Sequence, residues 1–244
     1  MRWQGEGFLL DVRKYGESSA LIDVFTVSLG RRVGLLRGAF NKNNRSVIQP
    51  GNQLFLTWNS RIEESLGSFK VELIKSRYHK ISEQRVGIEL FNLICVLCST
   101  FLPERVNFDE LYYKTIMYIE GEQTIEEKLQ RYVKWEIQLL KSLGFGLDLG
   151  KCIVSGSKKD LKFVSPKSGC AVSSKSGVGW EKKLLILPEF LGGDRVSEIP
   201  SKYDLENGFK LTEFFIKKNL QPVKRFQLES FFKSRNRVLS HFSI

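Results

Sequence analysis

Residues 21–39 read LIDVFTVSLGRRVGLLRGA, and this stretch decides the fold of the first part of the chain. Residues 21–27 are rich in β-branched and aromatic side chains, which favours a strand. Gly30 can adopt the positive φ that a tight hairpin needs, and the apolar run 33–36 then pairs back. The stretch therefore predicts a β-hairpin with two arginines at its turn.

Further strand signals surround this hairpin, at residues 8–12, 54–58 and 69–74. Five short strands within residues 1–80 fit a closed or nearly closed barrel, because closure removes exposed strand edges. The polar segment 40–49 is long for a hairpin connection and is expected to hold a helical turn or a mobile loop.

The apolar period changes after residue 80. Helical spacing predicts helices over three segments, 86–101, 111–119 and 124–144. Pro103 stops the first helix. Thr124 and Glu127 have the spacing of a capping box, which opens the third helix.

The remaining chain divides into a module and two helical segments. Residues 146–183 are rich in Gly, Ser and Lys and predict a small loop-and-hairpin module. Helical spacing resumes at 205–220, with Asp204 as the expected N-cap, and a last segment runs over 228–239. The expected fold class is α+β, with a barrel domain over 1–80, a helical domain over 81–145 plus 184–244, and the inserted module at 146–183.

The charge of the chain favours a polyanionic partner. The net charge is +11, which points to DNA, RNA or an anionic membrane surface. Residues 1–80 carry 13 Lys and Arg against 7 Asp and Glu, whereas residues 81–145 carry 7 against 10. Residues 146–183 carry 8 against 3. An acidic segment between basic ones indicates a protein with separate charged faces.

Membrane and export signals are absent from the sequence. No run of about 18 apolar residues is present, so no membrane span is expected. The start lacks an apolar signal core, and four cysteines in a chain of this length do not form a disulfide framework. A cytoplasmic location is the simplest expectation.

Basic side chains at the strand ends and in the long loop of the barrel are the candidate nucleic-acid-binding residues. They are Arg13, Lys14, Arg31, Arg32, Arg37, Lys42 and Arg45. Each one alone is as easily explained as solvated surface charge, but the set favours a face that binds phosphates, with a strong dependence on salt. One or two barrel aromatics are expected to stack on bases, out of Tyr15, Phe25, Phe40, Phe55, Trp58 and Phe69.

Enzyme and metal signatures are missing, so the chain is expected not to be an enzyme. No phosphate-binding loop, nucleophile elbow or H-E-x-x-H helix is present, and the chain has only two histidines. Cys95 and Cys98 lie in an apolar helical run, which indicates buried thiols. Cys152 and Cys170 each lack a second cysteine three residues later, so no metal or cofactor is expected.

Several strings in the sequence resemble the RecO recombination mediators of bacteria. In the barrel they are YGESS at 15–19, VFT at 24–26, GR at 30–31, LRGA at 36–39 and QPG at 49–51. Further on they are LGF at 143–145, LDL at 147–149 and FVSPKSG at 163–169. The string LPEFL at 187–191 is similar to alphaproteobacterial versions.

The resemblance implies an N-terminal oligonucleotide/oligosaccharide-binding (OB-fold) barrel, followed by a helical domain with an inserted zinc-finger-like module. It implies binding of single- and double-stranded DNA and annealing of complementary strands, without catalytic turnover. The implied partners are RecR, the acidic C-terminal tail of single-strand-binding protein and, indirectly, the RecA recombinase. The implied location is the cytoplasm, together with the nucleoid.

The chain departs from the family pattern in the central module. Zinc-binding members of the family carry two C-x-x-C pairs there. Aligned on the string at 163–169, those four positions fall on Cys152, Ser155, Ser173 and Ser176. Three of the four ligands are therefore serine, which implies a metal-free hairpin held together by packing.

The resemblance also suggests where the acidic tail binds. That tail ends in apolar residues in this family's partners, so its dock should combine an apolar groove with a basic rim. The helical layer and the C-terminal Lys233, Arg235 and Arg237 are the expected partner-binding elements.

Two other classes of function stay open at this point. One is an RNA-binding OB-fold protein, which composition does not separate from a DNA-binding one. The other is a metal-dependent nuclease with a diffuse site, for which no carboxylate motif stands out in the sequence.

Overall fold

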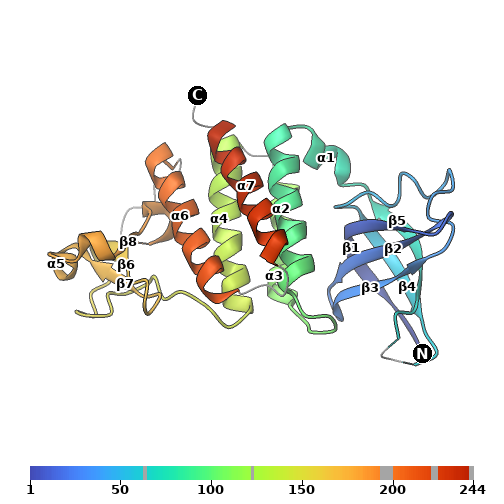
Figure 1. Cartoon of the computed structure of the whole chain (residues 1–244), viewed down its shortest axis with the longest axis horizontal. Coiled ribbons are helices and arrows are strands. Elements are labelled where there is room, and N and C mark those ends of the chain that lie inside the picture. Colours follow the sequence, from blue (N-terminus) through green and yellow to red (C-terminus); the bar gives the residue numbers. More distant parts are fainter. Residues whose placement is uncertain (63–64, 122–123, 193–199, 221–224, 242–244) are drawn as a thin grey trace. The chain divides into compact units, whose positions relative to one another are not determined.

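The computed structural model describes residues 1–62, 65–121, 124–192, 200–220 and 225–241. The chain forms two compact units, of which unit 1 comprises residues 1–121 with 224–244 and unit 2 comprises residues 122–223. Both units combine strands and helices, so the predicted α+β class is confirmed (Figure 1). Among the described residues, no helix is both long and apolar enough to cross a membrane.

Five strands close into a barrel at the start of unit 1. They are β1 (Arg2–Tyr15), β2 (Ser19–Thr26), β3 (Gly30–Leu36), β4 (Gln53–Asn59) and β5 (Ser68–Lys75). The strand order is β1-β2-β3-β5-β4. Strands β3 and β5 are parallel, and the other neighbours are antiparallel. The predicted hairpin is β2–β3, and Gly30 at its turn has a φ of +64°.

The apolar runs of β1 and β2 arise because both faces of these strands are buried. Leu9 and alternate residues of the other strands fill the barrel interior, together with Ala20, Ile22, Val24, Leu36, Leu54, Leu56, Trp58 and Phe69. On the outer face, the rings of Phe8 and Phe25 meet Tyr112 of α3 (Asp109–Glu120), with all three centroid distances at 5.5 Å. The helices therefore cover part of the outer barrel wall.

The polar segment between β3 and β4 is folded as successive turns. Ala39 and Ile48 from this segment are buried against the barrel core. The Asn44 side-chain amide donates to the Gly38 carbonyl at 2.8 Å. The buried Asn52 amide donates to the Ser46 carbonyl at 2.9 Å. The segment is thus held at both ends while its charged side chains face solvent.

Three helices follow the barrel in unit 1, and a fourth returns from the C-terminus. They are α1 (Tyr78–Ser82), α2 (Arg85–Phe101), α3 and α7 (Arg225–His241). Helix α7 packs along α2 (Figure 1). As predicted, α2 ends before Pro103, and Cys95 and Cys98 are buried in it. Burial raises the pKa of both thiols.

Unit 2 is built on two helices, α4 (Ile125–Ser142) and α6 (Lys202–Asn219). The predicted capping box of Thr124 and Glu127 is present at the start of α4. At α6 the N-cap is Ser201, whose hydroxyl accepts from the Asp204 N–H at 3.1 Å, so the prediction of Asp204 as the cap was wrong by one turn. The two helices contact each other, and the Thr212 hydroxyl donates to the buried Glu136 carboxylate at 2.5 Å.

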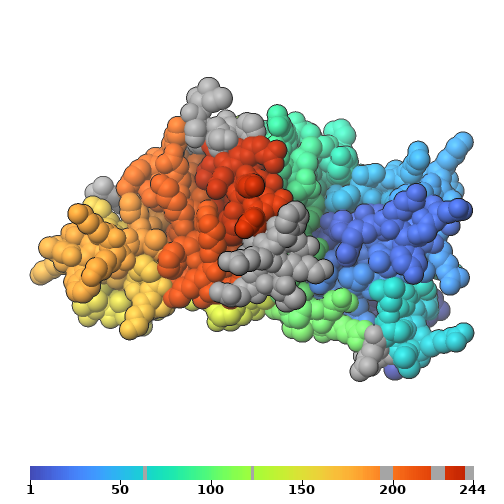
Figure 2. Space-filling view, viewed as in Figure 1, coloured from blue at the N-terminus to red at the C-terminus, as the bar shows by residue number. Residues whose placement is uncertain are grey.

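The central module is a small three-stranded sheet with short helices. Its strands β6 (Leu161–Val164), β7 (Ala171–Ser173) and β8 (Leu185–Ile186) have the order β7-β6-β8. The short helices are α5 (Ser174–Gly177) and two 3-10 turns, Glu181–Lys183 and Glu189–Leu191. The predicted hairpin is β6–β7, and β8 extends the module beyond residue 183. Figure 2 shows the outer face of this module, drawn in yellow and light orange, beside α6.

The two units divide the predicted helical domain. Helices α1–α3 and α7 belong with the barrel, whereas α4 and α6 belong with the module. The last helix, α7, packs on α2, so the C-terminal end of the chain returns to unit 1. Sequence periodicity identifies helices but does not tell which helix packs on which.

Candidate nucleic-acid interface

The register of the barrel brings basic residues from two strand ends together. Lys14 pairs with Ala20, and Ala20 pairs with Leu36, so the end of β1 lies one strand away from the end of β3. Arg13 and Lys14 on β1 and Arg37 just after β3 are all exposed. Arg13 lies 3.3 Å from the Asp11 carboxylate, an exposed pair that leaves most of its charge in solvent.

The loop after β3 adds two more cations to this end of the barrel. Lys42 and Arg45 are exposed on the folded segment that connects β3 to β4. Tyr15, the last residue of β1, is 57% exposed, whereas Phe25, Trp58 and Phe69 are buried. We call Arg13, Lys14, Arg37, Lys42 and Arg45, together with Tyr15, the basic barrel end.

Arg31 lies at the opposite end of β3 and is used inside the fold. Its guanidinium group forms a two-pronged pair with the Asp23 carboxylate, with Nη2 to Oδ2 at 2.8 Å and Nε to Oδ1 at 3.0 Å. Nη1 also donates to the Leu102 carbonyl at 3.3 Å. The side chain of Arg31 is 14% exposed and that of Asp23 is 1% exposed. Burial raises the pKa of Asp23, and the positive charge of Arg31 opposes that shift.

The backbone around Arg31 also makes contacts within the fold, as its side chain does. The Arg105 N–H donates to the Arg31 carbonyl at 3.0 Å. A Cβ at Gly30 would lie 1.7 Å from the Val106 carbonyl oxygen, so only glycine allows this approach. The β2–β3 turn is thus a joint between the barrel and the segment that follows α2.

Arg32 points into the barrel. It is 6% exposed, and its guanidinium carbon lies 4.6 Å from the centroid of the Trp58 ring. A cation over an indole face is a favourable contact that stabilises both buried groups. The seven predicted basic residues therefore divide into five exposed side chains at one end and two internal ones at the other.

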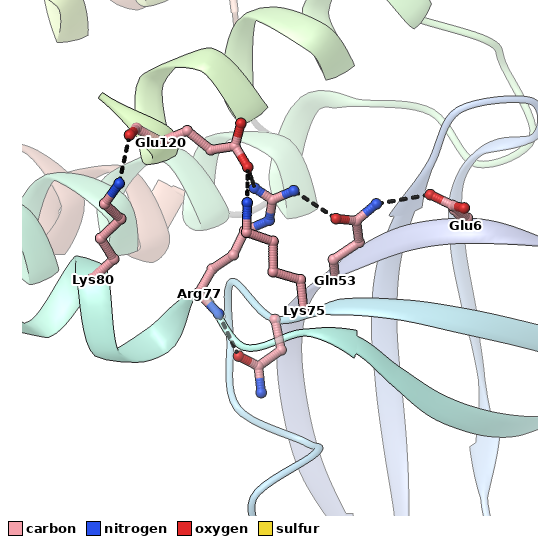
Figure 3. Close-up of polar contacts among 7 residues, drawn as sticks. Glu6, Gln53, Lys75, Arg77, Lys80 and Glu120 are labelled. Carbon is pink, nitrogen blue, oxygen red and sulfur yellow. Dashed lines mark hydrogen bonds and ion pairs between the residues drawn. The ribbon is translucent and has the colours of Figure 1, made fainter. Parts of the chain in front are cut away.

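A polar network that the sequence did not indicate joins the barrel to α3 (Figure 3). The buried Arg77 guanidinium binds Glu120 at the end of α3 and donates to Gln53 at 2.5 Å. Lys75 Nζ lies 2.6 Å from the Glu120 carboxylate, and the Lys80 ammonium donates to the Glu120 carbonyl at 2.9 Å. Gln53 continues the chain of contacts to Glu6 at 2.7 Å.

This network has a structural role. The hydrogen bond from Lys75 and the charge of Arg77 lower the pKa of Glu120. Arg77 and Glu120 are separated by 43 residues, and no local pattern connects them. The side-chain carbonyl oxygen of Asn52 also accepts from the Arg77 N–H at 3.0 Å, and this long-range contact fixes the entry to α1.

In the central module, the four positions of the expected zinc pattern come together. Cys152 Sγ accepts from the Ser173 N–H at 3.3 Å and lies 3.6 Å from the Ser176 hydroxyl. Burial acts to raise the pKa of Cys152, but hydrogen bonds from Ser155 and Ser173 outweigh burial and lower that pKa to about 5. One thiolate and three hydroxyls do not form a structural zinc site, whose ligands are thiolates and imidazoles.

Helix α7 presents only part of its expected basic rim. Lys233 and Arg237 are exposed, whereas Arg235 is fully buried. Phe231, Phe232 and Val238 are buried on the same helix. Because Arg235 lies within the fold, Lys233 and Arg237 are the two of the three predicted residues that can form an exposed rim on α7.

Within the described residues, no group of three or more His, Cys, Asp or Glu side chains is placed to hold a metal ion. The Nδ1 atom of His79 lies 3.7 Å from the Glu83 carboxylate, and the His79 side chain is exposed on α1.

Comparison with known proteins gives consistent matches over both units. Residues 1–77 match the family model described as Recombination protein O N terminal, and residues 90–227 match Recombination protein O C terminal. The chain is 39% identical over 229 residues to DNA repair protein RecO of Cereibacter sphaeroides, covering 91% of this chain and 92% of that protein. It is 41% identical over 218 residues to DNA repair protein RecO of Roseobacter denitrificans, covering 87% and 89%. For the RecO of Methylocella silvestris the identity is 37% over 220 residues, covering 90% and 88%.

Proposed function

The chain belongs to the RecO family of DNA repair proteins, and from that premise we propose that it is a non-enzymatic mediator of recombination. In this proposal it binds single- and double-stranded DNA, anneals complementary strands and acts on DNA coated with single-strand-binding protein. Together with RecR it promotes the loading of RecA. Chromosomal DNA is the substrate, which corresponds to a location in the cytoplasm at the nucleoid.

The observation that carries the proposal is the basic barrel end. Five exposed cations come from β1, from the residue after β3 and from the β3–β4 loop, and Tyr15 is exposed at the end of β1. Phosphates bound by such side chains release counterions, and the tyrosine ring offers a platform for one unstacked base. The closed barrel with β3 parallel to β5 supports its assignment as an OB fold. Arg31 and Arg32 are left out of the interface because their guanidinium groups are used within the barrel.

The first test measures how binding depends on salt. Each phosphate contact contributes about 0.7 to the slope of log K against log salt for single strands. We expect Arg37→Ala and Lys42→Ala each to weaken binding of an oligo-dT strand and to reduce the slope by about 0.7. Lys114→Ala, which removes an exposed charge from α3, serves as the matched control and should leave the slope unchanged. Equal slopes for all four proteins would exclude the basic barrel end as the interface.

The second test separates the proposed activity from its alternatives. Complementary labelled strands coated with single-strand-binding protein are mixed with the protein, and annealing and cleavage are followed in the same reaction with Mg²⁺ or Mn²⁺. Annealing with intact strands supports the mediator, and shortened strands would identify a nuclease. A matched RNA strand that competes more strongly than DNA would favour an RNA-binding function instead.

The proposed dock for the acidic tail of single-strand-binding protein lies on α7. Lys233 and Arg237 are exposed on this helix, and Phe231 and Val238 of the same helix are buried. Charge reversal by Lys233→Glu with Arg237→Glu should weaken the binding of a tail peptide while leaving binding of naked DNA unchanged. A tail peptide that binds the reversed variant as well as the natural protein would place the dock elsewhere.

The central module is proposed to work without metal. Hydrogen bonds among the Cys152 thiolate and the serines hold together the positions that a zinc ion holds together in the related pattern. Dialysis of the purified protein against a chelator should therefore leave both its folding and its annealing activity unchanged.

A further inference from the structure

The central module carries a large exposed aromatic side chain. Trp180 is 58% exposed, and all six residues of the turn 178–183 face solvent. The chain has four tryptophans, all within the described residues. Trp58 and Trp135 are each 3% exposed, and Trp3 is half-buried. Tryptophan is enriched at interfaces, and Val178 in the same turn is 71% exposed, so the turn presents apolar surface of the kind that a ligand covers.

The turn that presents Trp180 is held firmly. Gly177 lies against the Phe163 ring so closely that a Cβ there would be 2.6 Å from a ring carbon. The Trp180 N–H donates to the Gly177 carbonyl at 2.9 Å, and the Lys183 N–H donates to the Trp180 carbonyl at 2.8 Å. The ring is thus presented from a fixed backbone rather than from an open loop.

The surroundings of Trp180 are strongly basic. Residues 146–183 contain eight lysines, no arginine and three acidic residues. All eight lysines are exposed, at positions 151, 158, 159, 162, 167, 175, 182 and 183. The Lys183 ammonium lies 5.0 Å from the centroid of the Trp180 ring. An exposed indole with a cation beside it suits single-stranded nucleic acid, because a base can stack on the ring and a phosphate can bind the cation.

A second apolar loop adjoins this turn through the Cys152 cluster. Ile153 and Val154, which follow Cys152, are 53% and 72% exposed. Cys152 contacts Ser173 and Ser176, which precede the turn. A second copy of this chain is a poor occupant for the surface, because eight lysines would face eight lysines. The lysines of this surface fit a polyanionic ligand, and its exposed apolar side chains fit a ligand that also carries flat apolar groups.

We propose that the turn 178–183 and its flanking lysines form a second binding surface for single-stranded DNA, with Trp180 stacked on a base. This inference rests on the proposed function, since the ligand is the same polymer that the basic barrel end is proposed to bind. The two surfaces belong to different units of the chain. A protein with two such surfaces can hold two strands at once, which annealing requires.

The experiment uses the full-length protein and an unlabelled oligo-dT strand. Intrinsic tryptophan fluorescence is recorded during titration for the natural protein and for Trp180→Phe, and the difference reports on Trp180 alone. Affinity is measured separately with a labelled strand for Trp180→Ala and for Lys182→Ala with Lys183→Ala. Tyr203→Ala is the matched control, because Tyr203 is 62% exposed on α6 of the same unit.

We expect DNA to quench the Trp180 contribution, and Trp180→Ala to weaken binding by about five- to tenfold, in line with the loss of one stacked base. Trp180→Phe keeps an aromatic face and should stay within about twofold of the natural protein. The double lysine variant should bind more weakly with a reduced salt slope, and Tyr203→Ala should bind normally.

The outcomes separate this inference from the proposed function. If Arg37→Ala weakens binding while Trp180→Ala binds normally and shows no change in quenching, the second surface is refuted and the barrel interface stands. If Trp180→Ala weakens binding while Arg37→Ala and Lys42→Ala do not, the module is supported and the basic barrel end is refuted.

Discussion

At the scale of single residues, Arg31 and Arg37 show how one hairpin uses the same side chain in two ways. Both are basic and lie in the stretch that predicts the hairpin. Arg31 pairs with the buried Asp23 and the Leu102 carbonyl, whereas Arg37 is exposed after β3 ends. The alternation of a strand places neighbours on opposite faces, but only the packing of α2 and the segment after it decides that the outer face at Arg31 is covered.

Removing Arg31 should destabilise the protein. Arg31→Ala leaves the Asp23 carboxylate buried without its cation, and breaking a buried pair in this way costs about 3 kcal/mol. Urea unfolding followed by circular dichroism measures the change in the free energy of unfolding. Arg37→Ala is the control and should change it by less than about 0.5 kcal/mol. A stability of Arg31→Ala equal to that of Arg37→Ala would show that the pair with Asp23 does not hold the joint.

The thiol of Cys152 should make the stability of unit 2 depend on pH. Its pKa in the folded protein is lowered to about 5, from an ordinary value of 9.0. Between these values the folded state holds a thiolate while the unfolded state holds a thiol, so stability rises with pH and is lost as pH falls through about 5. Thermal unfolding between pH 5 and 9 should show this rise, and Cys152→Ala should flatten it. Identical pH profiles for the two proteins would contradict the thiolate.

At the scale of elements, the central module keeps the positions of a metal site without its ligands. The loop that holds Cys152 and Ser155 meets the β7–α5 junction through the Ser173 N–H, which donates to Cys152 Sγ at 3.3 Å. Within the junction, the Ser173 hydroxyl donates to the Ser176 hydroxyl at 3.0 Å. The sequence placed these four positions by alignment with a pattern. Their convergence depends on the backbone contact of this loop with β7, where the Ile153 N–H donates to the Ala171 carbonyl at 2.9 Å, and that contact is a tertiary property.

Restoring the missing thiols should create a zinc site. Changing Ser155, Ser173 and Ser176 to cysteine supplies four sulfur ligands, the donor set of structural zinc. We expect the triple variant to bind one zinc ion per chain, with a cobalt derivative showing tetrahedral absorption bands, and to unfold at a higher temperature with zinc than without. The natural protein under the same conditions is the control. A triple variant that folds but binds no zinc would mean that the four positions do not form a tetrahedron.

At the scale of the whole molecule, the order of elements along the chain differs from their grouping in space. Unit 2 is continuous in sequence, whereas unit 1 is completed by α7 from the C-terminus. Helix α7 contacts α2 and buries Phe231, Phe232 and Val238. The barrel and its supporting helices therefore form one unit together with the last segment of the chain.

Truncation should reveal this dependence. Residues 1–121 expressed alone lack α7 and should aggregate or unfold at a lower temperature, because the face of α2 that α7 covers becomes exposed. The same residues joined to 224–244 by a Gly-Ser linker should fold and bind oligo-dT. Thermal unfolding and size-exclusion chromatography compare the two chains. Equal behaviour of both would show that α7 is dispensable for unit 1.

The sequence by itself determined the five strands, the main helices, the capping box at Thr124 and the family, because these depend on local patterns of polarity, on turn residues and on matching strings. Tertiary structure decided which of the predicted basic residues are exposed, that Arg31, Arg32 and Arg235 lie within the fold, and that Arg77 and Glu120 join the barrel to α3. It also decided that Trp180 is exposed. Burial depends on which elements pack together over long separations in the chain, and local periodicity carries no information about that choice.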